Sequence, residues 1–327
     1  MAARKWIARR MEELDPETDY DEIWKLMAAY QPNEFVMNLV YTVTFPHFIV
    51  RELDALPVVR AGDGKMFQRA HSRADDTTRK FQTWWANGST SEETKKSVDG
   101  VNAMHARYAV EYPDSFAVND TFVYALCYEA AGLHRLMLRV GRPGFSKKEQ
   151  EAAARYWGNV AVLFKLGGTG PSVTGFPESF EGVMAFMDAW EAEDVPRHAY
   201  GHAAVTALLN QFAERFFPRP LRGLARKWVI SLYPDHLVHA YELKVPNRLA
   251  KVAYRKFTAT VFWIVQHVAP DPQITYIERH RQRDDAAVDK IKRMDAEFKA
   301  RHQPDFGCPH AAMSSVGEHD VPARQSV

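Results

Sequence analysis

Apolar residues spaced three and four apart recur along most of this 327-residue chain. That spacing is typical of helices that bury one face, whereas no run alternates apolar and polar residues between hairpin turns as a half-buried strand would. Hydrophobic residues make up 46% of the sequence, which is enough for a large core. We therefore predict an all-α protein built as a single large helical domain.

Capping signals divide this helical pattern into elements. Ser146 and Glu149 have the spacing of a capping box and predict a helix that ends near Gly167. Asn119 or Asp120 is expected to cap the next helix upstream, whose apolar residues surround nearly its whole circumference. The helix after residue 120 should therefore be central and buried.

The domain organisation follows from where the helical pattern begins and ends. No Pro/Gly/Ser-rich linker interrupts it between about residues 15 and 300. We expect residues 1–14 to be an N-terminal extension and residues 15–300 to be one domain. Residues 301–327 turn polar and small without an apolar period, which is typical of a disordered tail.

Charge and cysteine content exclude several classes of protein. A net charge of +1 and the absence of long basic runs make nucleic acid an unexpected partner. Two cysteines form no disulfide framework, and charges interrupt the N-terminal segment where a signal peptide would be apolar, so we expect a cytoplasmic location. The most apolar windows, 35–50 and 257–268, are shorter than the roughly 20 residues that span a bilayer. We expect both to be buried helices, with membrane contact at most peripheral.

A histidine lies within the segment VNAMHARYAV. Ser89 and Glu92 have capping-box spacing and predict a helix that continues to Tyr108. On that helix His105 shares the apolar face with Val98, and should point inward. A buried imidazole must donate from one nitrogen and either accept or coordinate a metal with the other. An ordinary hydrogen-bonded core histidine and a metal ligand are both compatible with this pattern.

A second unusual helix face lies upstream. Arg73, Thr77, Phe81 and Trp84 fall on one stripe, so that a guanidinium and a hydroxyl stand beside two large rings. The alternative interpretation makes the acidic residues 75–76 helix-cap or first-turn groups, with Arg73 their exposed partner.

Two histidine pairs have helical spacing, His198 with His202 and His236 with His239. Either pair could place two imidazoles on one face for zinc or iron. A metal enzyme that uses one of these pairs therefore stays open as an alternative.

An ordered series of segments resembles the MpaB-like and rubber-oxygenase (latex clearing protein) family. The resemblance covers roughly residues 15–281, and the segments that carry it are RADDT (73–77), VNAMHARY (101–108), NDTFVYAL (119–126), EQEAAARYWGNVAVLFKL (149–166) and FPESFEGVMAFMDAWE (176–191). It implies a globin-like or bundle domain that holds a b-type haem through one histidine. Members of the family insert dioxygen across the double bonds of isoprenoid chains and cleave them to carbonyls.

Carried over residue by residue, His105 is similar to the family's haem-ligating histidine. Arg73 and Thr77 match the family's arginine and threonine on the opposite helix, where they would stabilise negative charge that develops at the iron. Phe122 and Leu126, one turn apart, are expected to form a wall of the haem pocket or the substrate channel.

The sequence departs from the rubber-cleaving members in two respects. Asp76 replaces a lysine that precedes the family's threonine, and no residue matches the glutamate proposed there as a base. We therefore expect a haem b-dependent oxygenase that acts with O2 on an unsaturated, isoprenoid-like small molecule other than rubber. The alternatives are a helical lipid- or isoprenoid-binding protein without the chemistry, and a non-haem metal enzyme.

Overall fold

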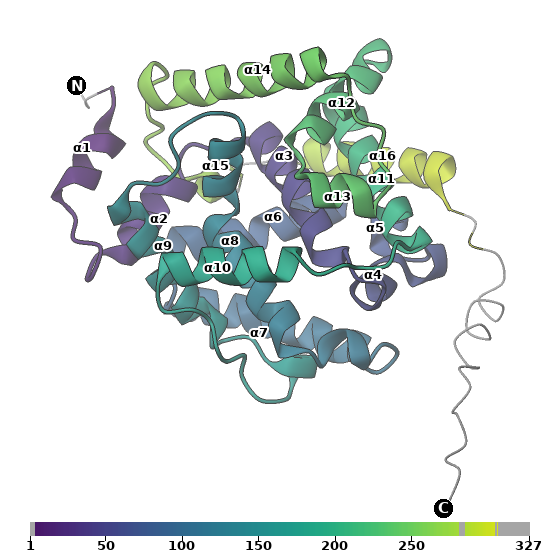
Figure 1. The fold of residues 1–327 in the computed structure, drawn as a ribbon, viewed down its shortest axis with the longest axis horizontal. Coiled ribbons are helices and arrows are strands. Elements are labelled where there is room, and N and C mark those ends of the chain that lie inside the picture. Colours follow the sequence, from purple (N-terminus) through teal and green to yellow (C-terminus); the bar gives the residue numbers. More distant parts are fainter. Residues whose placement is uncertain (1–3, 281–284, 305, 307–327) are drawn as a thin grey trace, which may run out of the picture.

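The computed structural model describes residues 4–280, 285–304 and 306, and in this part of the chain the all-α prediction is confirmed (Figure 1). No strand occurs among the described residues; Lys165 and Ser172 form an isolated antiparallel bridge. The helices form a single body with α8 (Asn119–Arg139) near its centre and α14 (Arg248–His267) along one edge.

The other α-helices are, in chain order, α1 (Trp6–Glu13), α2 (Tyr20–Ala28), α3 (Glu34–Thr44), α4 (Glu52–Val59), α5 (Lys65–Gln68), α6 (Ala70–Asn87), α7 (Glu92–Ala109), α9 (Lys147–Ala161), α10 (Phe180–Glu191), α11 (Ala199–Phe216), α12 (Arg222–Leu232), α13 (Asp235–Ala240), α15 (Tyr276–His280) and α16 (Asp285–His302). Short 3-10 helices join some of them: η1 (Phe45–Ile49), η2 (Arg60–Gly62), η3 (Asp114–Phe116), η4 (Leu166–Gly168) and η5 (Arg219–Leu221).

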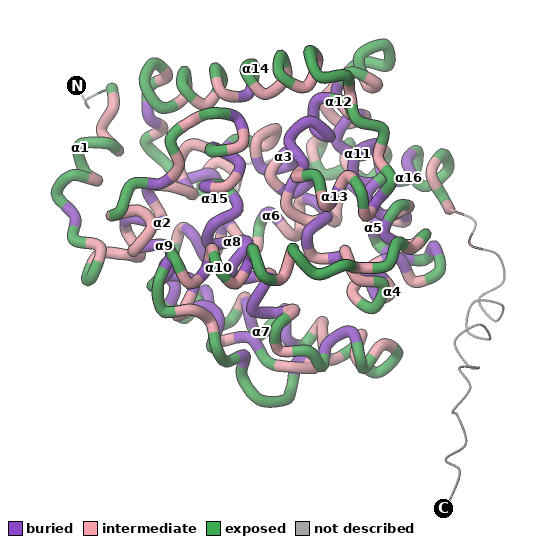
Figure 2. Tube along the Cα trace, in the orientation of Figure 1, coloured by how far each residue is buried: buried purple, intermediate pink, exposed green. Residues whose placement is uncertain are grey.

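Helix α8 is buried around most of its circumference, as its sequence predicts (Figure 2). It packs against α9 and α10. One core on this side is rich in aromatic rings: Trp24 stacks on Tyr156 with centroids 5.4 Å apart and meets Trp157 edge-on. A second core surrounds α11 and α12, where Phe212 and Trp228 pack together. Burial of such large rings supplies most of the driving force for folding.

Capping explains where α8 and α9 begin. The Ser146 capping box is confirmed, since its hydroxyl accepts from the Glu149 amide and the Glu149 carboxylate accepts from the Ser146 amide. Helix α9 ends at Ala161 rather than near Gly167, because the chain turns there into the bridged loop before η4. The predicted cap of α8 is wrong: Val118 holds that position, and the Asn119 side chain bonds the Thr174 backbone instead.

The N-terminus of α7 also differs from the prediction. Ser91, not Ser89, is the cap, and its hydroxyl accepts from the Thr94 amide at 3.2 Å. Ser89 is buried two residues earlier, where its amide donates to Asp21 at 2.8 Å. Both serines can cap a helix, and the contact with Asp21 decides between them.

The chain ends bear on the predicted domain limits. Part of the predicted extension packs on the domain, because Lys5 pairs with Asp271 at 2.6 Å and the Trp6 ring meets Tyr30 edge-on. Helix α16 continues to His302. Most of the predicted tail, residues 301–327, lies outside the described residues, and the domain limits stay predictions.

The sequence predicts that residues 35–50 and residues 257–268 form buried helices, and for residues 257–268 this prediction is wrong. Residues 35–50 form α3 and η1, which are largely buried, but in α14 only Thr258 is buried. The exposed apolar side chains, which we name the outer face of α14, are Leu249, Val252, Phe257, Val261, Trp263, Ile264 and, just beyond the helix, Val268. Among the described helices, none is both long and apolar enough to cross a bilayer.

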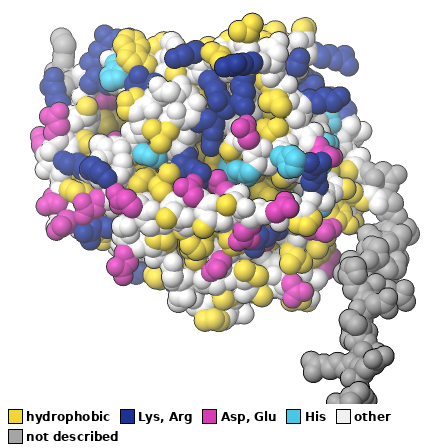
Figure 3. Space-filling model, viewed as in Figure 1, with side chains coloured by type: hydrophobic (Ala, Val, Ile, Leu, Met, Phe, Trp, Pro, Cys, Tyr) yellow, Lys and Arg dark blue, Asp and Glu magenta, His cyan; other side chains and the backbone are white. Residues whose placement is uncertain are grey.

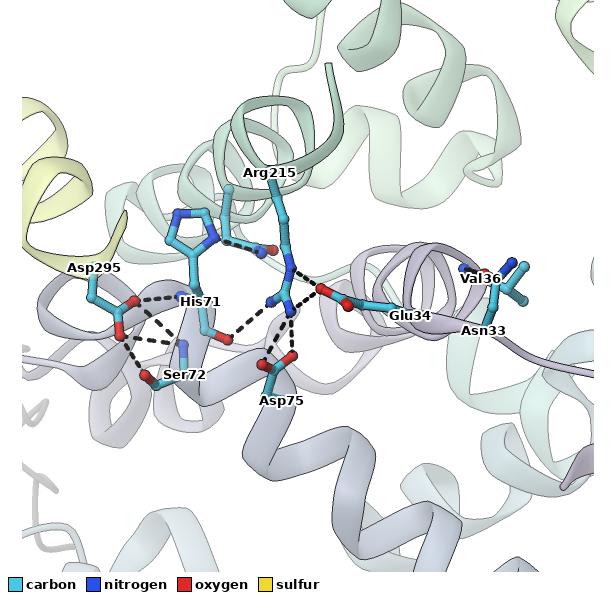
Figure 4. A network of polar contacts seen from close by, with 9 residues as sticks. Asn33, Glu34, Val36, His71, Ser72, Asp75, Arg215 and Asp295 are labelled. Atoms are coloured by element: carbon cyan, nitrogen blue, oxygen red, sulfur yellow. Dashed lines mark hydrogen bonds and ion pairs between the residues drawn. The ribbon is translucent and has the colours of Figure 1, made fainter. Parts of the chain in front are cut away.

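Charged side chains from distant elements hold the first turn of α6 (Figure 4). Asp295 of α16 accepts hydrogen bonds from the backbone amides of His71 and Ser72 at 2.7 and 3.3 Å. It thereby caps the N-terminus of α6, because the side chain of the N-cap residue, Arg69, makes no capping hydrogen bond. Arg215 of α11, only 2% exposed, binds Asp75 at 2.7 Å and Glu34 at 2.5 Å. This network fixes the first turn of α6, which carries Arg73; Thr77 follows one turn later.

The loop after α9 holds α7 in place. The Asn102 side chain donates to Leu163 O at 2.9 Å and accepts from the Lys165 amide at 3.1 Å. Gly168, with φ +79°, lies so close to α7 that a Cβ there would stand 2.1 Å from Asn102 O and 2.5 Å from the Ala106 amide nitrogen. Only glycine permits this approach, one residue from His105.

Replacing this glycine tests the contact. Gly168→Ala should lower the free energy of unfolding by about 3 kcal/mol or more, because it adds a backbone clash to the roughly 1–2 kcal/mol cost of a left-handed alanine. Gly141→Ala is the matched control, since its φ is +81° with nothing within 4 Å of the added Cβ. Denaturant unfolding should show the larger loss for Gly168→Ala, and equal losses would contradict the account.

Candidate functional site

A cavity of about 560 Å³ lies between α3, α6, α7 and α8. Its walls are mostly apolar and aromatic, with contributions from η1, α4 and η3. The aromatic residues that line it are Tyr41, Phe45, Phe48, Phe81, Trp84, Trp85, Tyr108, Phe116, Phe122 and Phe164. Its volume falls in the range of about 300–1,000 Å³ that is typical of cofactor and small-molecule sites.

His105 lines this cavity from α7, as the helix periodicity predicts. Its ring lies against Phe116 and Phe122, with centroids 4.9 and 5.7 Å away. Its Nδ1 atom is buried and has no hydrogen-bonding partner in the part of the chain that the structure describes. The ordinary core histidine considered above would have satisfied this nitrogen.

Burial, together with the nearby positive charge of Lys80, lowers the pKa of His105 to about 4. The imidazole is therefore neutral at pH 7. A neutral imidazole has a nitrogen lone pair, which is the form that binds a metal ion.

Arg73 and Thr77 line the same cavity from α6. The Arg73 guanidinium donates to the Tyr41 hydroxyl and lies 4.2 Å from the centroid of Phe45. Arg73 is thus turned inward, and the alternative that makes it an exposed partner of residues 75–76 is wrong. Asp75 pairs with Arg215, and Asp76 pairs with Arg79.

Phe122 and Leu126 are buried on α8 and line the cavity, and their contact with haem or substrate stays a prediction. The same helix contributes Glu129, which the sequence analysis missed. Its Oε1 atom is buried without a partner among the described residues, and burial raises its pKa to about 8. The available signal was one carboxyl group within the otherwise uncharged run 121–133 of this helix, two turns after Thr121, which also lines the cavity.

Several basic side chains reach the cavity from α5, α6 and α7. They include Lys65, Lys80 and Arg107. Burial lowers the pKa of Lys80. The cavity therefore offers cations at part of its boundary and an apolar surface elsewhere.

The two histidine pairs do not meet as metal sites. His198 caps α11: its Nδ1 accepts from the Gly201 amide and its Nε2 lies 2.9 Å from Val50 O. His202 Nδ1 lies 2.7 Å from Tyr241 O. These nitrogens are engaged with backbone groups, which leaves the non-haem alternative on this pair without support.

His236 turns away from its predicted partner. His239 contacts Arg197, whereas His236 lies with His47 and Glu191 in a cluster whose potential ligand atoms are all within 4.8 Å of one another. The Glu191 carboxylate already binds Arg135 at 3.0 Å and accepts from the Tyr124 hydroxyl at 3.0 Å. We interpret this cluster as a buried polar network, because its carboxylate is neutralised by the guanidinium.

A family model matches most of the chain. The family model for the catalytic domain of ER-bound oxygenase mpaB/B′/rubber oxygenase matches residues 36–263, which is more than half of the chain and includes the segments from α3 to α8 that form the cavity. No curated protein matches the chain.

The unpaired carboxyl of Glu129 predicts a pH dependence of stability. A folded-state pKa of about 8, above the ordinary 4.5, means that the folded state binds more protons than the unfolded state between these values. Wild-type stability should therefore fall as pH rises from about 4.5 to 8 relative to Glu129→Gln, which cannot ionise.

At pH 8 and above, Glu129→Gln should be more stable than wild type by about 1–3 kcal/mol, with no difference below pH 4.5. Denaturant unfolding at several pH values measures this. The exposed Glu12→Gln is the control and should follow wild type throughout. If the free energy of unfolding of Glu129→Gln also followed wild type at every pH, the Glu129 carboxyl would not be held uncharged in the folded protein.

Proposed function

The chain belongs to the family of mpaB/B′ and rubber-oxygenase catalytic domains, and from this premise we propose that it is a haem b-dependent oxygenase acting on an unsaturated hydrophobic small molecule. One observation carries the proposal. A neutral imidazole with an unpaired ring nitrogen faces an apolar cavity that also holds a guanidinium and a hydroxyl from another helix.

The residues of the cavity fit a haem in three respects. His105 is neutral at pH 7, so it has the lone pair that an iron ligand needs. The aromatic and aliphatic walls match the faces of a macrocycle, and Phe122 and Leu126 would contact it or the substrate. Lys65, Lys80 and Arg107 would supply cations for the two propionate groups.

Haem bound at His105 would supply the iron centre for activating dioxygen. The protein's own contribution is positional and electrostatic. Arg73, oriented by Tyr41 and Phe45, and Thr77, one turn further along α6, would donate hydrogen bonds to negative charge as it develops. The apolar walls would exclude water and bind an isoprenoid-like chain.

Glu129 would hold a proton inside the cavity. Since its carboxyl is uncharged at pH 7, it can donate a hydrogen bond or a proton to a substrate oxygen without leaving a second charge on the apolar wall. A binding protein without chemistry would not need this combination of donors, which is why the enzyme is favoured over a lipid-binding protein.

His105→Ala tests the haem assignment directly. The variant should retain at most about a tenth of the haem that the wild type holds, because the iron would lose its protein ligand. His267→Ala, on the exposed end of α14, is the matched control and should bind haem fully. Absorption spectra of the oxidised, reduced and CO-treated proteins give the haem content and show whether the iron is accessible.

Circular dichroism and thermal unfolding of each variant separate loss of haem from loss of fold. A folded His105→Ala protein with full haem content would contradict the proposal. With wild type, O2 consumption and carbonyl products from a panel of unsaturated isoprenoids test the reaction itself, and the saturated analogues should give neither.

Arg73→Met tests the proposed donor without knowledge of the substrate. Azide should bind the ferric protein at least tenfold more weakly in this variant than in wild type, because a charge-assisted hydrogen bond worth about 1.5–3 kcal/mol is lost. Haem content should not change. Arg219→Met, exposed on η5, is the control, and an unchanged azide affinity in Arg73→Met would remove Arg73 from this role.

A further inference from the structure

Helix α14 turns an apolar surface toward solvent. Leu249 is 83% exposed, Phe257 56% and Trp263 47%, and together with the other members of the outer face they extend along the whole helix. The helix lies along the edge of the molecule (Figure 1), and its trace is exposed or intermediate over most of its length (Figure 2). A continuous exposed apolar face of this kind marks a docking surface.

Helix α14 is attached to the rest of the domain mainly by the side opposite its outer face. The opposite side is anchored to α12, where the Trp228 indole donates to the Thr258 hydroxyl at 2.9 Å and Arg255 donates to Ser231 O at 2.9 Å. Lys251 pairs with Asp235 at the start of α13. The helix is therefore fixed on the protein by one side. Within the outer face, the Phe257 ring also meets the Trp228 ring edge-on, with centroids 5.7 Å apart, but it stays 56% exposed, and the other members are exposed to solvent.

The charged side chains in and around α14 are all positive. From residue 244 to residue 270 the sequence contains no Asp or Glu, while it contains Lys244, Arg248, Lys251, Arg255 and Lys256. Arg248 and Lys256 form no ion pair in the described part of the chain. The view in Figure 3 shows hydrophobic and basic side chains gathered along the edge that α14 forms.

The exposed apolar face and the positive charge together indicate what kind of partner binds α14. A second copy of the chain would place one α14 against another and bring like charges together, which is unfavourable in a dehydrated interface. A surface of anionic headgroups complements the basic side chains and accepts apolar side chains beneath the headgroup layer. Tryptophan is enriched at that depth of a bilayer, and lysine can extend its charge outward to the headgroups.

We infer that α14 docks the protein on anionic lipid surfaces, lying in the plane of the membrane with its outer face inserted. At about 1.5 Å per residue, a helix of 20 residues would cover roughly 30 Å of membrane surface. The inference goes beyond the proposed function and does not depend on the haem.

Vesicle co-sedimentation of the full chain tests this inference. Wild type should sediment with phosphatidylcholine vesicles containing about one-third phosphatidylserine, and at least tenfold less with phosphatidylcholine alone. Leu249→Ser with Trp263→Ser should lower the partition coefficient on the mixed vesicles at least tenfold, since both side chains lose their insertion energy. Lys256→Glu should weaken binding and reduce its dependence on salt.

Val110→Ser with Val162→Ser is the matched control, because these side chains are 87% and 56% exposed but lie away from α14. The control should bind vesicles like wild type, and all variants should keep their haem content and thermal stability. Wild type that fails to bind the mixed vesicles would overturn the inference. So would a wild-type dimer, seen by light scattering, that Leu249→Ser with Trp263→Ser converts to a monomer, since the outer face would then be a self-association surface.

Discussion

The cavity depends on the ion-pair network that fixes the first turn of α6. Arg215 is almost fully buried and binds Asp75 and Glu34, while Asp295 accepts from two amides that the helix itself leaves unpaired. Loss of one partner from such a buried network leaves an uncompensated charge, which typically costs about 3–5 kcal/mol. The network therefore holds Arg73 and Thr77 in register with α7, because helix α6 can neither rotate nor fray at this end.

The cavity itself contains groups that the protein alone does not satisfy. His105 and Glu129 each have a buried polar atom without a partner in the described structure, and a buried unpaired polar atom costs about 1–3 kcal/mol. Much of the remaining interior is packed with aromatic rings. Other buried polar atoms, such as His47 Nε2 and His236 Nε2, also lack a partner among the described residues. Those of His105 and Glu129 belong to residues that line the same cavity, which is expected where stability is given up for a ligand or cofactor.

Much of this architecture follows from local sequence. The 3.6-residue period predicts the all-α fold and places His105 on the inward side of α7. The same period puts Arg73 on one stripe with Thr77 and two rings, but its contacts with Tyr41 and Phe45 were needed to exclude an exposed position. The capping box at Ser146 is equally local. The resemblance to a family added the expected chemistry, which periodicity alone does not provide, and the family match over residues 36–263 confirms the membership.

What the sequence did not reveal depends on contacts between distant segments. Asp295 caps a helix more than 200 residues earlier in the chain, and Asp21 decides between two possible capping serines for α7. Glu129 is not part of any recognisable sequence motif. For α14, apolar residues occur around most of the helix, so the period could not show which side packs on α12 and which faces solvent.

The most direct test of the central claim is a crystal structure of the protein with haem bound. We expect iron bonded to a ring nitrogen of His105, with the macrocycle inside the cavity between α6, α7 and α8 that Arg73 and Thr77 also line. Iron bonded to another residue, or haem bound outside this cavity, would contradict it.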